Sequence, residues 1–164
     1  YVRNLMMAAC DPVAGFVYQG VRRDCPPAQP APTMADWQAL ESKLGEIIAS
    51  VRTRAPRARI IFVQYVRLLP DANCAATGLD AEELMASRNL GERLAAATAR
   101  AAENGNAEVL AADVLSRRHT PCDAVPWSKG RMTPGDSSPG APWHPNAAGH
   151  AAIADALAER LKPN

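Results

Sequence analysis

The sequence predicts an α/β fold built around a parallel sheet, and three observations support this prediction. A stretch with an apolar stripe at helical spacing runs to Pro56 and is followed by residues 59–65, a continuous β-branched and aromatic run. Such a run is typical of a strand that is buried on both faces of a sheet. A second helical stretch at residues 80–103 precedes a second apolar run at residues 107–113, and an alanine-rich helix follows. Alternating helices and buried strands favour parallel pairing.

The first 33 residues show little regular patterning. Val2, Leu5, Met6 and Ala9 recur at helical spacing, which predicts a helical turn before Cys10. Residues 11–33 contain five prolines and two glycines. We therefore predict an irregular surface segment here.

The first long helix is expected to begin at Thr33 or Asp36 and to end before Pro56. Thr and Asp are preferred N-cap residues, and proline is incompatible with a helix interior. The second helix is expected to end at residues 104–106, which read Asn-Gly-Asn. We expect the apolar stripe of the first helix to pack on the sheet, and its members are Trp37, Leu40, Leu44, Ile47, Ile48 and Val51.

The composition indicates one globular domain, residues 1–164. The chain is 48% hydrophobic and 21% charged, which is sufficient for a core of ordinary size. Lys and Arg number 18 against 17 Asp and Glu, so no strong field exists to attract nucleic acid. The sequence shows neither an integral membrane segment nor a signal peptide.

The four cysteines are Cys10, Cys25, Cys74 and Cys122, and their spacing does not resemble that of zinc ligands. Four cysteines allow three pairings. We predict the sequential pairing, Cys10–Cys25 and Cys74–Cys122, because the first pair brackets a loop rich in proline and glycine. Disulfides form in oxidising compartments, so the predicted location is secreted or periplasmic. The alternative is four free thiols.

His144 is the leading candidate for a chemical role. It stands in a loop directly before a helix predicted at residues 147–161, and the start of that helix is marked by Pro145 and Asn146. A histidine presented by such a loop is a better catalytic candidate than one on an apolar helix face, where histidines are usually structural.

The stretch His-Pro-Asn-Ala-Ala-Gly-His at residues 144–150 resembles the C-terminal motif of secreted SGNH (GDSL-type) esterases and lipases. Residues 59–70 resemble the central strand of this family and the loop that leaves it, and residues 119–122 with Trp127 resemble its disulfide-bearing loop. The three matches stand in the family's order. The resemblance implies a three-layer sandwich with a central parallel sheet, a Ser-His mechanism acting on an ester or lipid substrate, and no metal or other cofactor.

In this family the histidine of the motif is the general base, so the resemblance implies that role for His144. The family commonly places an Asp three residues earlier, where this chain has Ala141. Some members use a main-chain carbonyl instead, and we predict that the Ala141 carbonyl orients the imidazole. Asp136 is the second candidate for this role. Substrate contacts are predicted for two aromatic residues, Trp143 and Tyr65.

Each aromatic residue also has a structural alternative. Trp143 lines an acyl pocket in one interpretation and packs the loop down in the other. Tyr65 stands at the exit of the predicted strand, where open α/β sheets bind ligands, and the alternative is a place in the core.

Three features of the family pattern have no counterpart in a matching context. These are the strand that ends in the nucleophile, Gly-Asp-Ser, a glycine that follows later, and the Gly-x-Asn-Asp segment that supplies an oxyanion-hole asparagine. Residues 135–137 spell Gly-Asp-Ser, but they lie between Pro134 and Pro139 with no strand before them, so we interpret this match as coincidence. Because two parallel strands do not form a stable sheet alone, we expect the chain to be the C-terminal part of a larger hydrolase. The serine would lie on an N-terminal segment, covalently continuous or bound as a separate chain.

Two other functions remain open. An acyltransferase would use the same chemistry with an alcohol in place of water as the acceptor. A non-catalytic binding or scaffold domain is favoured if the chain is complete, because no serine nucleophile would then be available.

Overall fold

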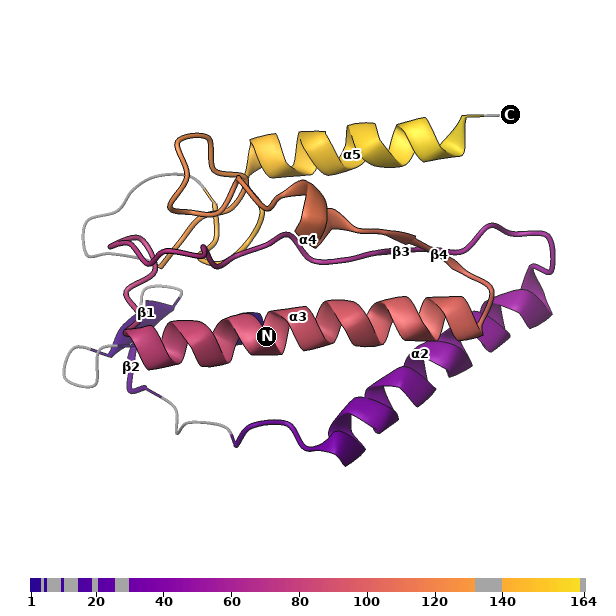
Figure 1. The fold of residues 1–164 in the computed structure, drawn as a ribbon, viewed down its shortest axis with the longest axis horizontal. Coiled ribbons are helices and arrows are strands. Elements are labelled where there is room, and N and C mark those ends of the chain that lie inside the picture. Colours follow the sequence, from indigo (N-terminus) through magenta and orange to yellow (C-terminus); the bar gives the residue numbers. More distant parts are fainter. Residues whose placement is uncertain are drawn as a thin grey trace.

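The structure is a computed structural model that describes residues 1–3, 5, 10, 15–18, 21–25, 30–131 and 140–162. Its helices and strands lie in layers, with α5 on one side of β3 and β4 and with α3 and α2 on the other (Figure 1). This arrangement confirms the predicted α/β class. The elements are β1 (Phe16–Tyr18), β2 (Val21–Arg23), α2 (Met34–Arg54), β3 (Ile61–Val63), α3 (Ala81–Asn104), β4 (Glu108–Leu110), α4 (Ala112–Leu115) and α5 (Ala147–Leu161).

Strands β3 and β4 pair in parallel, as the sequence predicted, with Ile61 opposite Glu108. Both strands are shorter than the apolar runs that predicted them. The second run ends early because the chain turns into α4 after Leu110. Ser116 stabilises this turn, since its hydroxyl donates to the Ala112 carbonyl at 2.6 Å and accepts from the Arg67 backbone N–H at 2.7 Å.

The three long helices begin and end close to the predicted residues. Helix α2 starts after Thr33, whose hydroxyl accepts from the Asp36 backbone N–H while the Asp36 carboxylate accepts from the Thr33 backbone N–H. Helix α3 starts after Asp80 and has Gly105 as its C-cap, and α5 starts after the N-cap Asn146. Local capping signals therefore predicted these boundaries correctly.

The apolar stripe of α2 does not cover the sheet in the described structure, so this prediction was wrong. Helix α2 packs against α3, and the end of α2 crosses the end of α3 in the view of Figure 1. Trp37 and Ile48 are buried in this packing, whereas Ile47 is 52% exposed.

Strands β1 and β2, which lie within residues 16–23, pair in antiparallel orientation where an irregular segment was predicted. All the prolines between residues 11 and 33 lie outside this interval. Its Val, Phe and Tyr residues favour strands.

The buried core lies where the chain leaves β3. Because Trp143 belongs to it, the core supports the loop that carries His144. The main core cluster consists of Leu5, Val66, Leu68, Leu69, Leu79, Leu84 and Trp143.

The two predicted disulfides are confirmed, Cys10–Cys25 and Cys74–Cys122. No helix among the described residues has the length and apolar character needed to cross a membrane.

Candidate active site

His144 is exposed in the loop before α5, and a main-chain carbonyl holds its ring. Its Nδ1 lies 2.7 Å from the carbonyl oxygen of Pro142. When Nδ1 carries the proton, it donates to this oxygen and leaves Nε2 unprotonated. This arrangement is suited to a general base, because the free nitrogen is defined by the bond that the other nitrogen makes.

The carbonyl at the ring belongs to Pro142, whereas the sequence had pointed to Ala141. The Ala141 carbonyl accepts instead from the His144 backbone N–H at 3.2 Å, within a tight turn. This turn brings the next carbonyl, that of Pro142, against Nδ1. The second candidate, Asp136, and the Gly-Asp-Ser tripeptide lie outside the described residues.

Trp143 has a left-handed backbone, with φ of 61°, and its side chain is 1% exposed. A bulky residue in this region is strained by about 1–2 kcal/mol, so surrounding contacts must hold it there. Its N–H donates to the Lys129 carbonyl at 3.0 Å, and its own carbonyl accepts from the Tyr65 hydroxyl at 3.0 Å. The structure thus places Trp143 in the core, which corresponds to the packing alternative.

Residues 127–131 run beside the His144 loop and hold its backbone. The Lys129 N–H donates to the His144 carbonyl at 3.1 Å. The same segment is anchored at its far end, where the Arg131 N–H donates to the Ala76 carbonyl at 2.9 Å. The backbone position of His144 is therefore fixed by contacts with a segment that precedes its own loop in the chain.

His119 has a structural place. Its ring stacks on Trp127 with centroids 4.0 Å apart and planes 5° apart, and its Nδ1 lies 2.8 Å from the Val125 carbonyl. Cys122 in the same loop is bonded to Cys74. This cluster braces the segment that holds His144.

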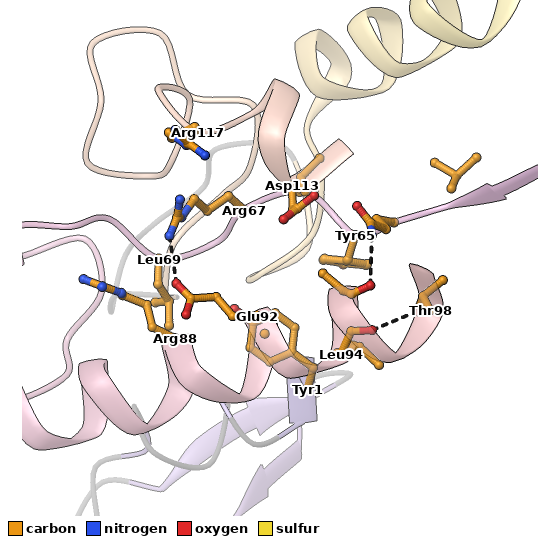
Figure 2. A pocket seen from close by; sticks show the side chains of 15 residues that line it. Tyr1, Tyr65, Arg67, Leu69, Arg88, Glu92, Leu94, Thr98, Asp113 and Arg117 are labelled. Carbon is orange, nitrogen blue, oxygen red and sulfur yellow. Dashed lines mark hydrogen bonds and ion pairs between the residues drawn. The ribbon is translucent and has the colours of Figure 1, made fainter. Parts of the chain in front are cut away.

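Tyr65 lines a cavity of about 490 Å³ between β3 and α3 (Figure 2). Burial raises the pKa of its phenol. His144 does not line this cavity, and the Tyr65 hydroxyl links the cavity to the His144 loop through the Trp143 carbonyl. Other residues around it are Tyr1, Gln64, Arg67, Glu92 and Asp113.

Three polar atoms around this cavity are buried and have no hydrogen-bond partner among the described residues. They are Gln64 Oε1, Arg88 Nε and Asp113 Oδ1. A buried polar atom without a partner costs about 1–3 kcal/mol, so native proteins rarely leave several together.

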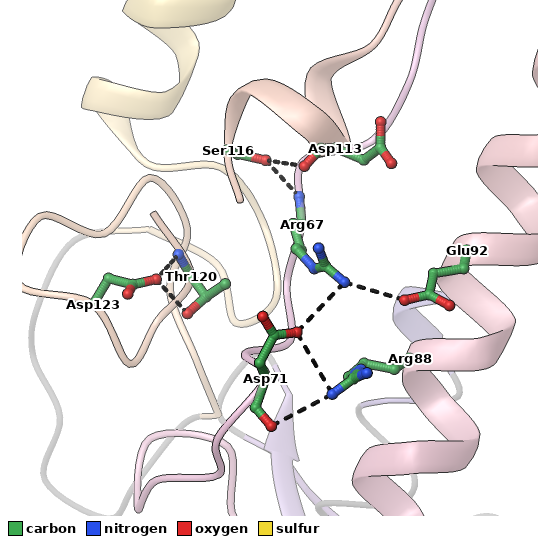
Figure 3. A network of polar contacts seen from close by, with 8 residues as sticks. All are labelled: Arg67, Asp71, Arg88, Glu92, Asp113, Ser116, Thr120 and Asp123. Carbon is green, nitrogen blue, oxygen red and sulfur yellow. Dashed lines mark hydrogen bonds and ion pairs between the residues drawn. The ribbon is translucent and has the colours of Figure 1, made fainter. Parts of the chain in front are cut away.

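An ion-pair network joins the exit of β3 to α3 (Figure 3). Arg67 pairs with Glu92 at 3.1 Å and lies 3.8 Å from Asp71, which is also 3.6 Å from Arg88. Glu92, the partner of Arg67, lies on another element, and no local sequence signal links the two.

The ring of His144 has Pro142 as its hydrogen-bond partner, and no serine hydroxyl in the described ranges contacts it. Ser137 lies outside those ranges.

Sequence reasoning missed the side-chain donor of Asn146, which was recognised only as an N-cap. Its Nδ2 reaches the carbonyl of Pro126, and a contact between residues so far apart in the chain has no local signal.

Residues 19–152 match the GDSL-like Lipase/Acylhydrolase family. Since the match spans most of the chain, the chain belongs to this family. A comparison with functionally curated proteins gave no significant match.

Two solved structures from Streptomyces have a similar fold. The phospholipase A1 from Streptomyces albidoflavus NA297 gives a TM-score of 0.66 at 21% identity, over 76% of this chain and 52% of that one. An extracellular lipase from Streptomyces rimosus gives 0.64 at 23% identity, over 76% of this chain and 53% of that one. This chain thus matches about half the length of each structure, and at these identities the likeness concerns the fold.

Proposed function

We propose that this chain supplies the general base of a serine ester hydrolase, with His144 as the base and the Pro142 carbonyl as its orienter. The observation that carries the proposal is the exposed His144 ring, whose Nδ1 is held by a carbonyl 2.7 Å away in a chain of the GDSL-like family. Nε2 would take the proton of the serine hydroxyl as Oγ attacks the ester carbonyl. The imidazolium would then return this proton to the leaving alcohol, and water would release the acyl group.

A neutral carbonyl differs from the carboxylate of a complete triad. It stabilises the imidazolium less, but it still selects the tautomer that leaves Nε2 free. We therefore assign to Pro142 the role of fixing the direction and tautomer of the His144 ring.

The nucleophile and the oxyanion-hole donors belong, in this proposal, to a segment that precedes the chain in the complete protein. The free edge of β3 supports this assignment, because in the described structure β3 pairs with β4 alone. The cavity between β3 and α3 is lined by Gln64 and Asp113, which each have a buried polar atom without a partner among the described residues. An added strand would supply both sheet hydrogen bonds and polar partners there.

The substrate class we propose is a carboxylic ester or lipid, and the location is secreted or periplasmic. The similar structures are described as a phospholipase A1 and an extracellular lipase. The two disulfides favour an oxidising compartment.

The first test compares His144→Ala with His150→Ala in the full-length protein. His150 is exposed on α5 and serves as the matched control. We expect His144→Ala to lower the hydrolysis of a short p-nitrophenyl ester by about 100- to 10,000-fold, the usual contribution of a general base. His150→Ala should retain wild-type activity, and both variants should keep the wild-type melting temperature. Near-normal hydrolysis by His144→Ala would overturn the proposal.

The second test concerns the chain without its preceding segment. A base without a nucleophile or oxyanion donors provides little catalysis, so residues 1–164 alone should hydrolyse the ester no faster than buffer. Hydrolysis by this chain alone that His144→Ala abolishes would show that the nucleophile lies within it.

A further inference from the structure

Three of the hydrogen bonds of Asn146 join three parts of the site. Its backbone N–H donates to the Trp127 carbonyl at 2.9 Å, and its Nδ2 donates to the Pro126 carbonyl at 2.7 Å. Its Oδ1 accepts from the Gly149 N–H at 2.9 Å and so caps α5. One residue, two positions after His144, thus ties the His144 loop to a distant segment and to the first turn of the helix.

The side chain uses its donor and its acceptor for different purposes. Asp, Ser and Thr cap helices about as well as Asn, because each offers an oxygen acceptor. Among these N-cap residues, only Asn also carries an N–H group that can donate. Helix capping therefore accounts for the Oδ1 contact with Gly149, and it leaves the bond from Nδ2 to Pro126 unexplained.

The bond to Pro126 counteracts a strained turn. Trp143 has a φ of 61° and lies between Pro142 and His144 in the chain. The Pro142 carbonyl is the hydrogen-bond partner of His144 Nδ1. Such a backbone persists only where neighbouring contacts hold it. Lys129 holds the turn on one side, through the N–H of Trp143 and the carbonyl of His144, and Asn146 holds it on the other.

The two carbonyls that accept hydrogen bonds from Asn146, those of Pro126 and Trp127, belong to a segment that is itself held in place by other contacts. The Trp127 N–H donates to the His119 carbonyl at 2.8 Å, and the rings of these residues are stacked. A Cβ added at Gly149 would lie 2.2 Å from the Trp127 carbonyl oxygen, so α5 approaches this segment closely. Residues 126 and 127 are therefore a fixed point against which the His144 loop is held.

We propose that Asn146 is a positioning residue for the reaction, and that its bond to the Pro126 carbonyl keeps the His144 imidazole in the direction and tautomer needed for proton transfer. The inference rests on the proposed function, since it assigns the base role to His144. Loss of the bond lets the turn relax, which moves the Pro142 carbonyl away from Nδ1.

The test uses Asn146→Ser and Asn146→Asp in the full-length protein. Both variants keep an oxygen that accepts from Gly149 and remove the Nδ2 amide group that donates to Pro126. Ser is neutral and has a shorter side chain that ends in a hydroxyl, and Asp keeps the shape of Asn without its N–H donors. We expect kcat for a short p-nitrophenyl ester to fall by about 10- to 100-fold, as for a catalytic group displaced by about 1 Å. KM and the melting temperature should remain close to wild type.

A direct measurement separates positioning from general damage. Side-chain ¹⁵N spectra should show His144 mainly protonated at Nδ1 in the wild type and as a mixture of tautomers in both variants, with His144→Ala used for assignment. Thr33→Ala, which removes the side-chain cap of α2, controls for helix destabilisation and should leave kcat and the spectra unchanged.

The outcomes distinguish the two proposals. Unchanged kcat and unchanged tautomer in both Asn146 variants would overturn the positioning role, and so would an activity loss accompanied by a wild-type tautomer and a large fall in melting temperature. If His144→Ala remains active, the proposed function fails, while the spectra still decide whether the bond to Pro126 holds the ring.

Discussion

Gly149 determines how closely α5 approaches the segment that holds His144. A Cβ at this position would lie 2.2 Å from the carbonyl oxygen of Trp127 and 3.0 Å from its Cβ. The first contact is with backbone, which cannot rotate away as the end of a side chain can. Any larger residue must therefore separate the helix from the loop.

We predict that Gly149→Ala lowers the free energy of unfolding by about 1–3 kcal/mol, the usual cost of forcing atoms into a packed site. A methyl group at Gly45 in α2 would have no heavy atom of a neighbouring residue within 4 Å, so Gly45→Ala is the matched control. There the substitution should raise the free energy of unfolding by about 0.5–1 kcal/mol, because alanine loses less backbone entropy in a helix. Urea denaturation measures both values, and equal effects of the two substitutions would contradict this account.

At the scale of elements, the Cys74–Cys122 disulfide connects the loop after β3 with the loop that contains His119 and Trp127. Those two loops support residues 127–131, which hold the His144 backbone. The Cys10–Cys25 disulfide lies beside the β1–β2 hairpin instead. The two disulfides should therefore differ in their effect on activity.

We predict that replacing both Cys74 and Cys122 with Ser lowers the free energy of unfolding by about 4 kcal/mol, from the loop entropy of a 48-residue separation. For Cys10 and Cys25, 15 residues apart, the same relation gives about 3 kcal/mol. Ester hydrolysis by the full-length protein, measured below the melting temperature of each variant, should fall only for the first pair. Equal losses of activity would show that the Cys74–Cys122 bond has no particular role in holding His144.

At the scale of the whole molecule, Tyr1 makes stability depend on alkaline pH. Its ring is partly buried against α3, and burial raises its pKa well above the usual value of 10.0. The folded protein therefore keeps the phenol proton at a pH where the unfolded chain has lost it. Because the unfolded state then binds fewer protons, the free energy of unfolding falls as the pH rises above 10.0.

We predict that Tyr1→Phe makes the free energy of unfolding less dependent on pH in this alkaline range, since Phe has no proton to release. Urea denaturation at pH values on either side of about 10, the ordinary pKa of tyrosine, measures the difference between wild type and variant. The comparison cancels the contributions of other titrating groups that both proteins share. An identical alkaline slope in the two proteins would mean that Tyr1 ionises equally well in the folded state.

The sequence by itself determined features that depend on neighbouring residues. The first residues of α2, α3 and α5 follow from the N-caps Thr33, Asp80 and Asn146, because a cap acts on backbone groups within about one turn. The order of helices and buried strands predicted a parallel sheet, and the short motif around His144 predicted the family to which the chain belongs. Each of these signals can be recognised in the sequence itself, without knowledge of the fold.

Only the tertiary structure decided which groups meet across long stretches of chain. Trp143 is a core residue with a left-handed backbone because Lys129 and Tyr65 hold it from other segments. That backbone in turn directs the Pro142 carbonyl, rather than that of Ala141, to the His144 ring. The stripe of α2 likewise meets α3 instead of the sheet. A helical period shows that a face is apolar, but the partner of that face depends on how all the elements pack together.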